Sequence, residues 1–496
     1  MSVNRVLPVV FVLALSAPAF GQTVDEQGAK QLSENLARYV GSQAIDKGVA
    51  KVSLEGDAYK IAFDFKALAG MLPKQNFAKF NLAPYALLAK PRRDGKWDVS
   101  ADMSTSASFE VEGLQGPQST QLAIAGGKFA GVYDPELAAF ASATTSMTGM
   151  TMDSRDAMQR VKVSTGPGTA TMSAAKAVNG GADFTMTQTI AVFAEAIDFD
   201  DPNSGLKFPL AITSPGLSVN ATGKGIRTKP LLDLLAFAVA NEDEAKLKGN
   251  QAQLKSLLLA ALPLWERIDG TYGFKDFAVD SPVGRFGAAE LGTSFGSDGI
   301  AQNGTINYAI RAAGLTIPRN VLPSWSAALL PTDIDLNFGG ANIDLDSMTK
   351  KAIEAFDLNN KPPLPADFGD QIKADFMAKT PKFVIGHSTV KNGGIEIVLE
   401  GEMTFPGATP MANVTLDITG YEKIVETLQT AAKTDPQAAQ YFSGALAIKG
   451  FGKTLPDGRL EWVINTKADG SVTVNGAMLK PADSVGTDDS GEEATP

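Results

Sequence analysis

The segment Thr228–Asp269, TKPLLDLLAFAVANEDEAKLKGNQAQLKSLLLAALPLWERID, is the longest helical pattern in this chain of 496 residues. Thr228 is the predicted N-cap of its first helix. Apolar residues fill one broad face over 231–239, and a second apolar run covers 254–264 beyond a charged turn at 241–250. We expect a helical hairpin packed on a sheet, because the chain on both sides of it is patterned as strands.

Alternating apolar and polar residues predict strands through most of the remaining sequence. Asn392-Gly393 and Asp469-Gly470 each predict a hairpin turn. The second turn should set Val472 and Val474 opposite Trp462 and its neighbours, so that these side chains form cross-strand pairs. Clear strand patterns lie at 59–65, 97–103, 109–111, 122–124, 184–186, 306–310, 334–338, 383–385, 395–399 and 460–464.

The expected fold class is therefore α+β and β-dominated, with long curved antiparallel sheets, short amphipathic helices and a central helical hairpin. One of the helices is predicted over 27–47, with Leu32 and Leu36 on its apolar face. The expected organisation along the chain is a signal peptide (1–21), an N-terminal β-rich half (22–227), the central hairpin (228–269), a C-terminal β-rich half (270–481) and a disordered acidic tail (482–496).

The first residues have the pattern of an export signal. Arg5 precedes a short apolar core at 6–15, and Ala19-Phe20-Gly21 is a small-x-small cleavage site. The apolar core is too short to span a membrane, which takes about 20 residues. We expect cleavage after Gly21 and release into the periplasm.

Composition limits the classes of partner and of chemistry. The chain contains no cysteine, so it has no disulfides, thiolate metal sites or cysteine nucleophiles. Its formal net charge is −11, which argues against nucleic acid and against general adsorption to anionic lipid.

A strand that runs into a short amphipathic helix recurs at 59–72, 217–240, 334–356 and 414–432. With the export signal and the segments 420–428 and 469–476, this texture resembles a family of exported envelope proteins of Gram-negative bacteria whose domain has no assigned function. It is also similar to AsmA-like proteins. The likeness covers most of the mature chain and rests on no invariant motif. AsmA-like proteins are usually tethered to a membrane, whereas this chain would be released, and the resemblance brings no catalytic residue.

His387 is the only histidine, so any Ser-His-carboxylate triad would have to use it. The sequence contains no Gly-x-Ser-x-Gly elbow to supply the nucleophile, and one histidine cannot build a His-rich zinc site. We expect no catalytic residue, and we interpret His387 as a histidine on a surface or at the end of a strand.

Three other patterns suggest metal sites, and we favour a structural interpretation of each. The segment 198–205 (DFDDPNSG) is a loose calcium loop that lacks a closing glutamate, so an Asx/Pro turn is expected. Asp333/Asp335 and Asp344/Asp346 alternate with apolar residues and are predicted on the polar faces of strands. Met147, Met150 and Met152 offer thioethers for Cu(I), but alternation predicts that Met147 lies on the opposite face from the other two.

No cofactor is expected. The stretches Gly166-Pro167-Gly168 and Gly223-Lys224-Gly225 belong to no nucleotide fingerprint and are predicted to be turns. The favoured function is a non-catalytic periplasmic protein that holds a lipid or another apolar ligand on a β-sheet groove. The alternatives are an envelope scaffold that binds another protein through a sheet edge or face and, more weakly, an exported hydrolase.

Overall fold

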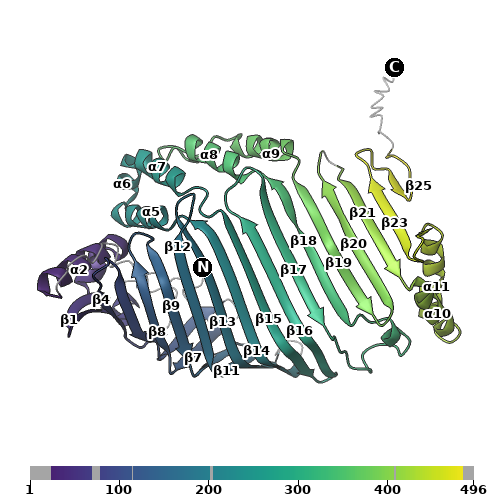
Figure 1. Cartoon of the computed structure of the whole chain (residues 1–496), viewed down its shortest axis with the longest axis horizontal. Coiled ribbons are helices and arrows are strands. Elements are labelled where there is room, and N and C mark those ends of the chain that lie inside the picture. The colour runs from purple at the N-terminus through teal and green to yellow at the C-terminus, as the bar shows by residue number, and fades with distance from the viewer. Residues whose placement is uncertain (1–23, 70–78, 114–115, 201–204, 407–408, 484–496) are drawn as a thin grey trace, which may run out of the picture. The chain divides into compact units, whose positions relative to one another are not determined.

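The computed structural model describes residues 24–69, 79–113, 116–200, 205–406 and 409–483. The expected signal peptide and most of the expected tail lie outside these residues. Strands hold 50% of the chain and helices 24%, which confirms the β-dominated α+β class (Figure 1). None of the described helices has the length and apolarity needed to cross a membrane. The chain divides into two compact units, Met1–Val321 with Asp344–Gly369, and Leu322–Ile343 with Asp370–Pro496.

The sheet of the first unit has two panels, and its described strand pairs are antiparallel. Panel A pairs β1 (Ala50–Glu55), β2 (Ala58–Phe63), β4 (Tyr85–Pro91), β5 (Trp97–Asp102), β8 (Lys128–Asp134), β9 (Ala139–Met147) and β12 (Gly168–Lys176) in that order. Panel B pairs β3 (Lys79–Leu82), β6 (Thr105–Gly113), β7 (Gly116–Ala125), β10 (Gly149–Arg155) and β11 (Gln159–Thr165).

The panels join at β13 (Ala182–Asp200), whose 182–190 part pairs with β12 and whose 193–199 part pairs with β11. The sheet continues through four further long strands: β14 (Lys207–Ile226), β15 (Arg267–Ser281), β16 (Gly284–Asp298) and β17 (Gly304–Ala313). Consecutive short strands, such as β11 and β12, therefore act as two halves of one long strand that is broken in the middle.

We call the line of these breaks the crease. It passes through Ala83–Pro84, Met103–Ser104, Gly126–Gly127, Thr148, Gly166–Pro167, Val192, Pro215, Asp276 and Ala289. Several of these residues have backbone angles that a regular strand does not use, with φ of 59° at Gly126, 56° at Val192 and 43° at Asp276. The predicted turns at Gly166–Gly168 and Gly223–Gly225 are therefore wrong: the first is part of the crease, and the second lies inside β14.

A buried serine satisfies backbone groups at the crease. The Ser214 side chain is 3% exposed. Its Oγ lies 2.6 Å from the carbonyl oxygen of Lys275 and 2.8 Å from that of Gly216, and it accepts a hydrogen bond from the Gly216 amide at 3.2 Å. The hydroxyl thus replaces ladder hydrogen bonds that the break removes.

Helix α2 (Glu26–Val40) covers one end of the first unit. Asp25 caps it by accepting a hydrogen bond from the Gly28 amide at 2.8 Å. The predicted apolar face is confirmed, because Leu32 and Leu36 are 2% and 0% exposed. They pack in a buried cluster with residues of β1, β2, β4, β5 and β8, among them Tyr59, Ile61, Trp97, Val99 and Tyr133. The short helices α3 (Ser42–Asp46) and α4 (Phe65–Ala69) belong to the same end.

The central helices form three segments: α5 (Thr228–Ala240), α6 (Glu244–Gly249) and α7 (Gln251–Ala261). Helices α5 and α7 contact each other as the expected hairpin, but the predicted charged turn between them contains α6. The prediction for Thr228 is wrong: Arg227 occupies the N-cap, and the Thr228 hydroxyl donates to the carbonyl of Leu137 at 2.5 Å. Tertiary contact has replaced the local cap. Helix α8 (Leu345–Ala355) completes this unit.

The second unit contains β18 (Asp333–Ile343), β19 (Lys382–Asn392), β20 (Ile395–Thr404), β21 (Met411–Thr419), β22 (Lys453–Thr454), β23 (Leu460–Thr466), β24 (Val472–Val474) and β25 (Ala477–Lys480). The predicted turn at Asn392-Gly393 is confirmed, since Asn392 pairs with Ile395. Its helices are α10 (Tyr421–Ala431), α11 (Pro436–Lys449) and the short η3 (Ser326–Ala328), while α9 (Phe368–Ala378) crosses the boundary in the sequence.

Trp462 anchors the buried cluster of the second unit. It is 3% exposed, its indole N–H donates to the carbonyl of Ile448 at 2.9 Å, and its ring lies 5.4 Å from that of Tyr421. The predicted cross-strand pairing also forms, with Val474 opposite Ile464. The predicted two-residue turn is wrong, because Thr466 pairs with Val472 and five residues connect them.

We expect Ser214→Ala to lower the free energy of unfolding by about 1–3 kcal/mol, because the half-buried Gly216 amide loses its acceptor and the Lys275 carbonyl loses its contact with the buried hydroxyl. Denaturant unfolding of the purified chain measures the change. Ser218→Ala, an exposed position on the same strand, is the matched control and should have little effect. Equal stability of the two variants would show that Ser214 does not support the crease.

We expect Trp462→Ala to cost about 3–5 kcal/mol of unfolding free energy, as for other buried aromatic residues. The mutation removes the indole from the cluster and leaves the Ile448 carbonyl without this donor. Val463→Ala, on the other face of β23, provides the comparison in the same melts. A melt of Trp462→Ala that overlays the wild type would contradict the assignment of this face to the core.

Candidate functional site

One side of the first unit's sheet is apolar across many strands, and we call it the apolar face. In panel B, cross-strand partners run in one row from Ala107 through Leu122, Met152, Val163, Glu195, Ile212 and Val279 to Phe286. In panel A, rows of partners hold Met172, Met186, Ile190, Leu217, Val219, Tyr272, Phe274, Leu291, Phe295, Tyr308 and Ile310. The neighbouring rows on the other side are mainly Ser, Thr, Ala and Asn in panel A, and they also hold charged residues such as Asp153 and Lys162 in panel B.

The irregular residues at the crease keep the apolar face on one side of the sheet. The Phe193 ring in panel B lies 5.4 Å from the Phe274 ring in panel A, and Phe274 lies 5.3 Å from Phe277 in panel B. Rings on opposite sides of a sheet could not approach so closely. Each break therefore offsets the alternation, so that apolar side chains before and after it point the same way.

The crease also bends the sheet toward its apolar face. Tyr272 pairs with Val219, whereas Glu195 pairs with Ile212, seven residues away along β14. In a flat sheet the two side chains would be about 20 Å or more apart. Burial raises the pKa of the Tyr272 phenol, and the nearby Glu195 carboxylate raises this pKa further. The Phe193 and Phe274 rings, 5.4 Å apart, show directly that the apolar surfaces of the two panels meet at the crease.

The apolar face is partly shielded rather than buried. Most of its side chains are half-buried, while Tyr272 is 41%, Phe295 46% and Ile306 39% exposed. The buried clusters of the described residues lie elsewhere, under α2 and against α10 and α11. A large apolar surface therefore remains accessible, which is more than a soluble sheet usually leaves open.

Glu195 is the only charged side chain on the apolar face of panel B among the described residues. No ion pair joins it to another residue of the described chain. One strand away, the Thr165 hydroxyl is buried without a hydrogen-bond partner in the structure, and Thr165 pairs with Phe193 on the same face. An otherwise apolar surface therefore contains two polar groups whose hydrogen-bonding capacity is unused.

The second unit repeats this pattern by itself. Phe338 pairs with Ile385, and Phe383 pairs with Met403, on the side of the sheet that carries Trp462. Phe338 and Phe383 are 37% and 41% exposed. A buried serine recurs as well, since the Ser388 hydroxyl accepts from the Asn337 amide at 2.9 Å where β18 and β19 shift register.

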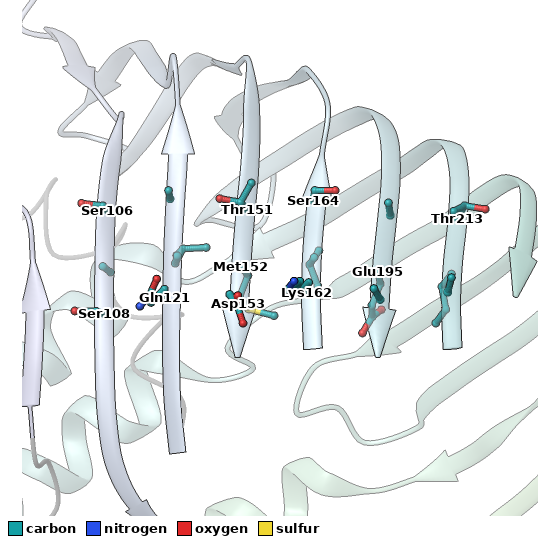
Figure 2. A pocket seen from close by; sticks show the side chains of 18 of the residues that line it. Ser106, Ser108, Gln121, Thr151, Met152, Asp153, Lys162, Ser164, Glu195 and Thr213 are labelled. Atoms are coloured by element: carbon teal, nitrogen blue, oxygen red, sulfur yellow. The ribbon is translucent and has the colours of Figure 1, made fainter. Parts of the chain in front are cut away.

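The opposite, polar side of panel B has a shallow hollow of about 790 Å³ (Figure 2). Its floor is backbone, and its rims are two rows of mostly small side chains that include Ser106, Thr151 and Ser164 in one row and Ser108, Gln121 and Asp153 in the other. Figure 2 shows these rows crossing adjacent strands. The Asp153 carboxylate forms an ion pair with Arg160 at 2.5 Å, so its charge is already neutralised.

A second hollow of about 860 Å³ separates α2 and α3 from the central helices. Glu34, Arg38 and Lys246 are among its lining residues. Charges of both signs and helix backbone line it, without a cluster that would favour one ligand.

His387 lies in the interior of β19, where that strand bulges opposite Glu400, and not at a strand end. Its side chain is 67% exposed, with Nδ1 3.6 Å from a Glu400 carboxylate oxygen. The nearest serine, Ser388, points into the sheet and bonds to the carbonyl of Gly386. Ser388, His387 and Glu400 therefore do not form a catalytic triad.

Asp344 and Asp346, which belong to one of the metal-site candidates, have structural roles. Among the described residues no group of three or more His, Asp or Glu side chains could hold an ion. The central residues 201–204 of the expected turn lie outside the described residues. The prediction that Asp344 and Asp346 are on a strand face is wrong: Asp344 is 2% exposed and caps α8 by accepting from the Ser347 amide at 2.9 Å, and Asp346 pairs with Lys350 at 2.9 Å.

The prediction that Met147 lies on the opposite face from Met150 and Met152 is also wrong. Met147 pairs with Gly168, next to Ile190, on the apolar face, and the crease at Thr148 brings Met150 and Met152 to the same side. All three thioethers therefore contribute to the apolar surface.

Comparison with known proteins gives no match to a family model, to a curated protein or to a solved structure.

We expect His387→Ala to change the free energy of unfolding by less than about 0.5 kcal/mol and to leave any cellular phenotype unaffected, because the side chain is exposed. The adjacent Ser388→Ala is the matched contrast, since it empties a buried hydrogen-bonding site. A well-folded His387→Ala protein that has lost its phenotype would reveal an active site at this bulge.

Proposed function

We propose that the protein is a non-catalytic periplasmic lipid-binding protein that holds acyl chains against its apolar faces. The observation that carries this proposal is the accessible apolar face on both sides of the crease in the first unit. An acyl chain gains free energy from any apolar surface that it removes from water, at roughly 25 cal/mol per Å². It needs no directional partner, which suits a face of Met, Leu, Ile and Phe side chains.

The location follows from the expected export signal, whose residues lie outside the described part of the chain. A periplasmic carrier meets lipid without being embedded in a membrane. The resemblance to exported envelope proteins fits the same role and remains an expectation.

A second candidate function, docking to an envelope protein, is favoured by the surface of α11 and the turn that follows it. Tyr441, Leu446, Ile448 and Phe451 are 51%, 46%, 54% and 41% exposed. Exposed apolar residues clustered on one helix are typical of a protein interface. This surface belongs to the second unit and is separate from the apolar face of the first.

We expect Phe295→Glu to reduce the lipid that copurifies with the protein several-fold, because it places a charge on the apolar face. Phe295 is already 46% exposed, so the thermal melt should move little. Lipid extraction and mass spectrometry of the purified protein, expressed in an envelope-containing host, measure the bound lipid.

Ser294→Glu is the matched control, because this adjacent residue pairs with Thr271 on the polar side of the sheet. It should retain wild-type lipid. Wild-type protein that carries no lipid, and that recovers one protein partner instead, would favour the docking function. Equal lipid loss in both variants would refute the assignment to the apolar face.

A further inference from the structure

We propose that the apolar face of the first unit selects lipids whose head group carries an ammonium group, with the Glu195 carboxylate as its acceptor. This inference rests on the proposed lipid-binding function and adds the class of ligand. It arises from one unusual position, a carboxylate in a row whose cross-strand partners are Val163 and Ile212.

The charge of Glu195 has no partner in the described chain, although two basic residues lie on the neighbouring strand. Lys162 and Arg160 lie on neighbouring β11, but alternation places both on the polar side, where Arg160 pairs with Asp153. Glu195 is half-buried among apolar side chains and has no counter-ion in the described chain. A ligand that brings a cation would supply the missing partner, whereas an anionic head group would be repelled.

Two further groups fit an ammonium donor at this place. The unpartnered Thr165 hydroxyl is an acceptor on the adjacent strand, one pair along from Val163. Burial, and after it the charge of Glu195, raises the pKa of the Tyr272 phenol in panel A. A head group at Glu195 would therefore lie near Thr165, and its chain would lie over the aromatic cluster of Phe193, Phe274 and Phe277.

Three probes with the same chain test this inference: dodecylamine, dodecanol and dodecanoate. Each displaces a fluorescent apolar reporter from the full-length mature protein at pH 7, below its micelle concentration. The wild type should bind dodecylamine roughly tenfold more tightly than dodecanol, as for a charge-assisted hydrogen bond, and dodecanoate most weakly.

Glu195→Gln should bring dodecylamine and dodecanol to within about twofold of each other, and Glu195→Lys should favour dodecanoate. Asp198→Asn is the matched control, because it removes an exposed carboxylate three residues away on the polar side of β13. It should keep the wild-type preference. Superimposable thermal melts of the variants would exclude misfolding as the cause.

Each contrary result has one meaning. An unchanged amine preference in Glu195→Gln, or an equal loss in Asp198→Asn, overturns the role of Glu195. Equal binding of the three probes by the wild type overturns the head-group inference and leaves the lipid function standing. Binding of none of the probes overturns both.

Discussion

The fold of the first unit depends on how a broad antiparallel sheet can bend without leaving backbone groups unpaired. Each long strand gives up regular ladder bonds at the crease, and those groups must find other partners. Ser214 supplies some of them from a position that is 3% exposed, and the Ser104 hydroxyl accepts from the Gly127 amide at 3.1 Å. These small polar side chains make the bend compatible with a continuous hydrogen-bonded sheet.

The bend decides the location of the apolar surface. Because each break offsets the alternation, Phe193 and Phe274 meet on one side although they come from different panels. The buried clusters form only where a helix covers strands, as α2 does over Trp97 and as α10 and α11 do over Trp462. The long strands between have no such cover in the described chain. They combine a continuous backbone hydrogen-bond ladder with an accessible apolar surface. The proposed binding of an apolar ligand requires both.

The polar side explains why the apolar side can be left accessible. Threonine and serine pairs such as Thr171 with Thr187, 2.8 Å apart, line it and keep the sheet hydrated. One face of each strand is therefore polar, and the other is apolar and partly exposed. Glu195 is the charged exception on the apolar face of panel B among the described residues. In our proposal this carboxylate selects the lipid head group.

The sequence by itself determined the β-dominated class, the apolar face of α2 and the turn at Asn392-Gly393, because these depend on local periodicity and turn chemistry. The apolar ligand that the sequence suggested stays a prediction. The sequence could not locate the crease, because no local sequence pattern marks an irregular residue such as Thr148. For this reason Met147 was assigned to the wrong face. Nor could it reveal that the Phe193 and Phe274 rings come together, because their approach depends on a bend shared by many strands. Local patterns fix which side chains alternate, but only the tertiary structure decides which surfaces face each other.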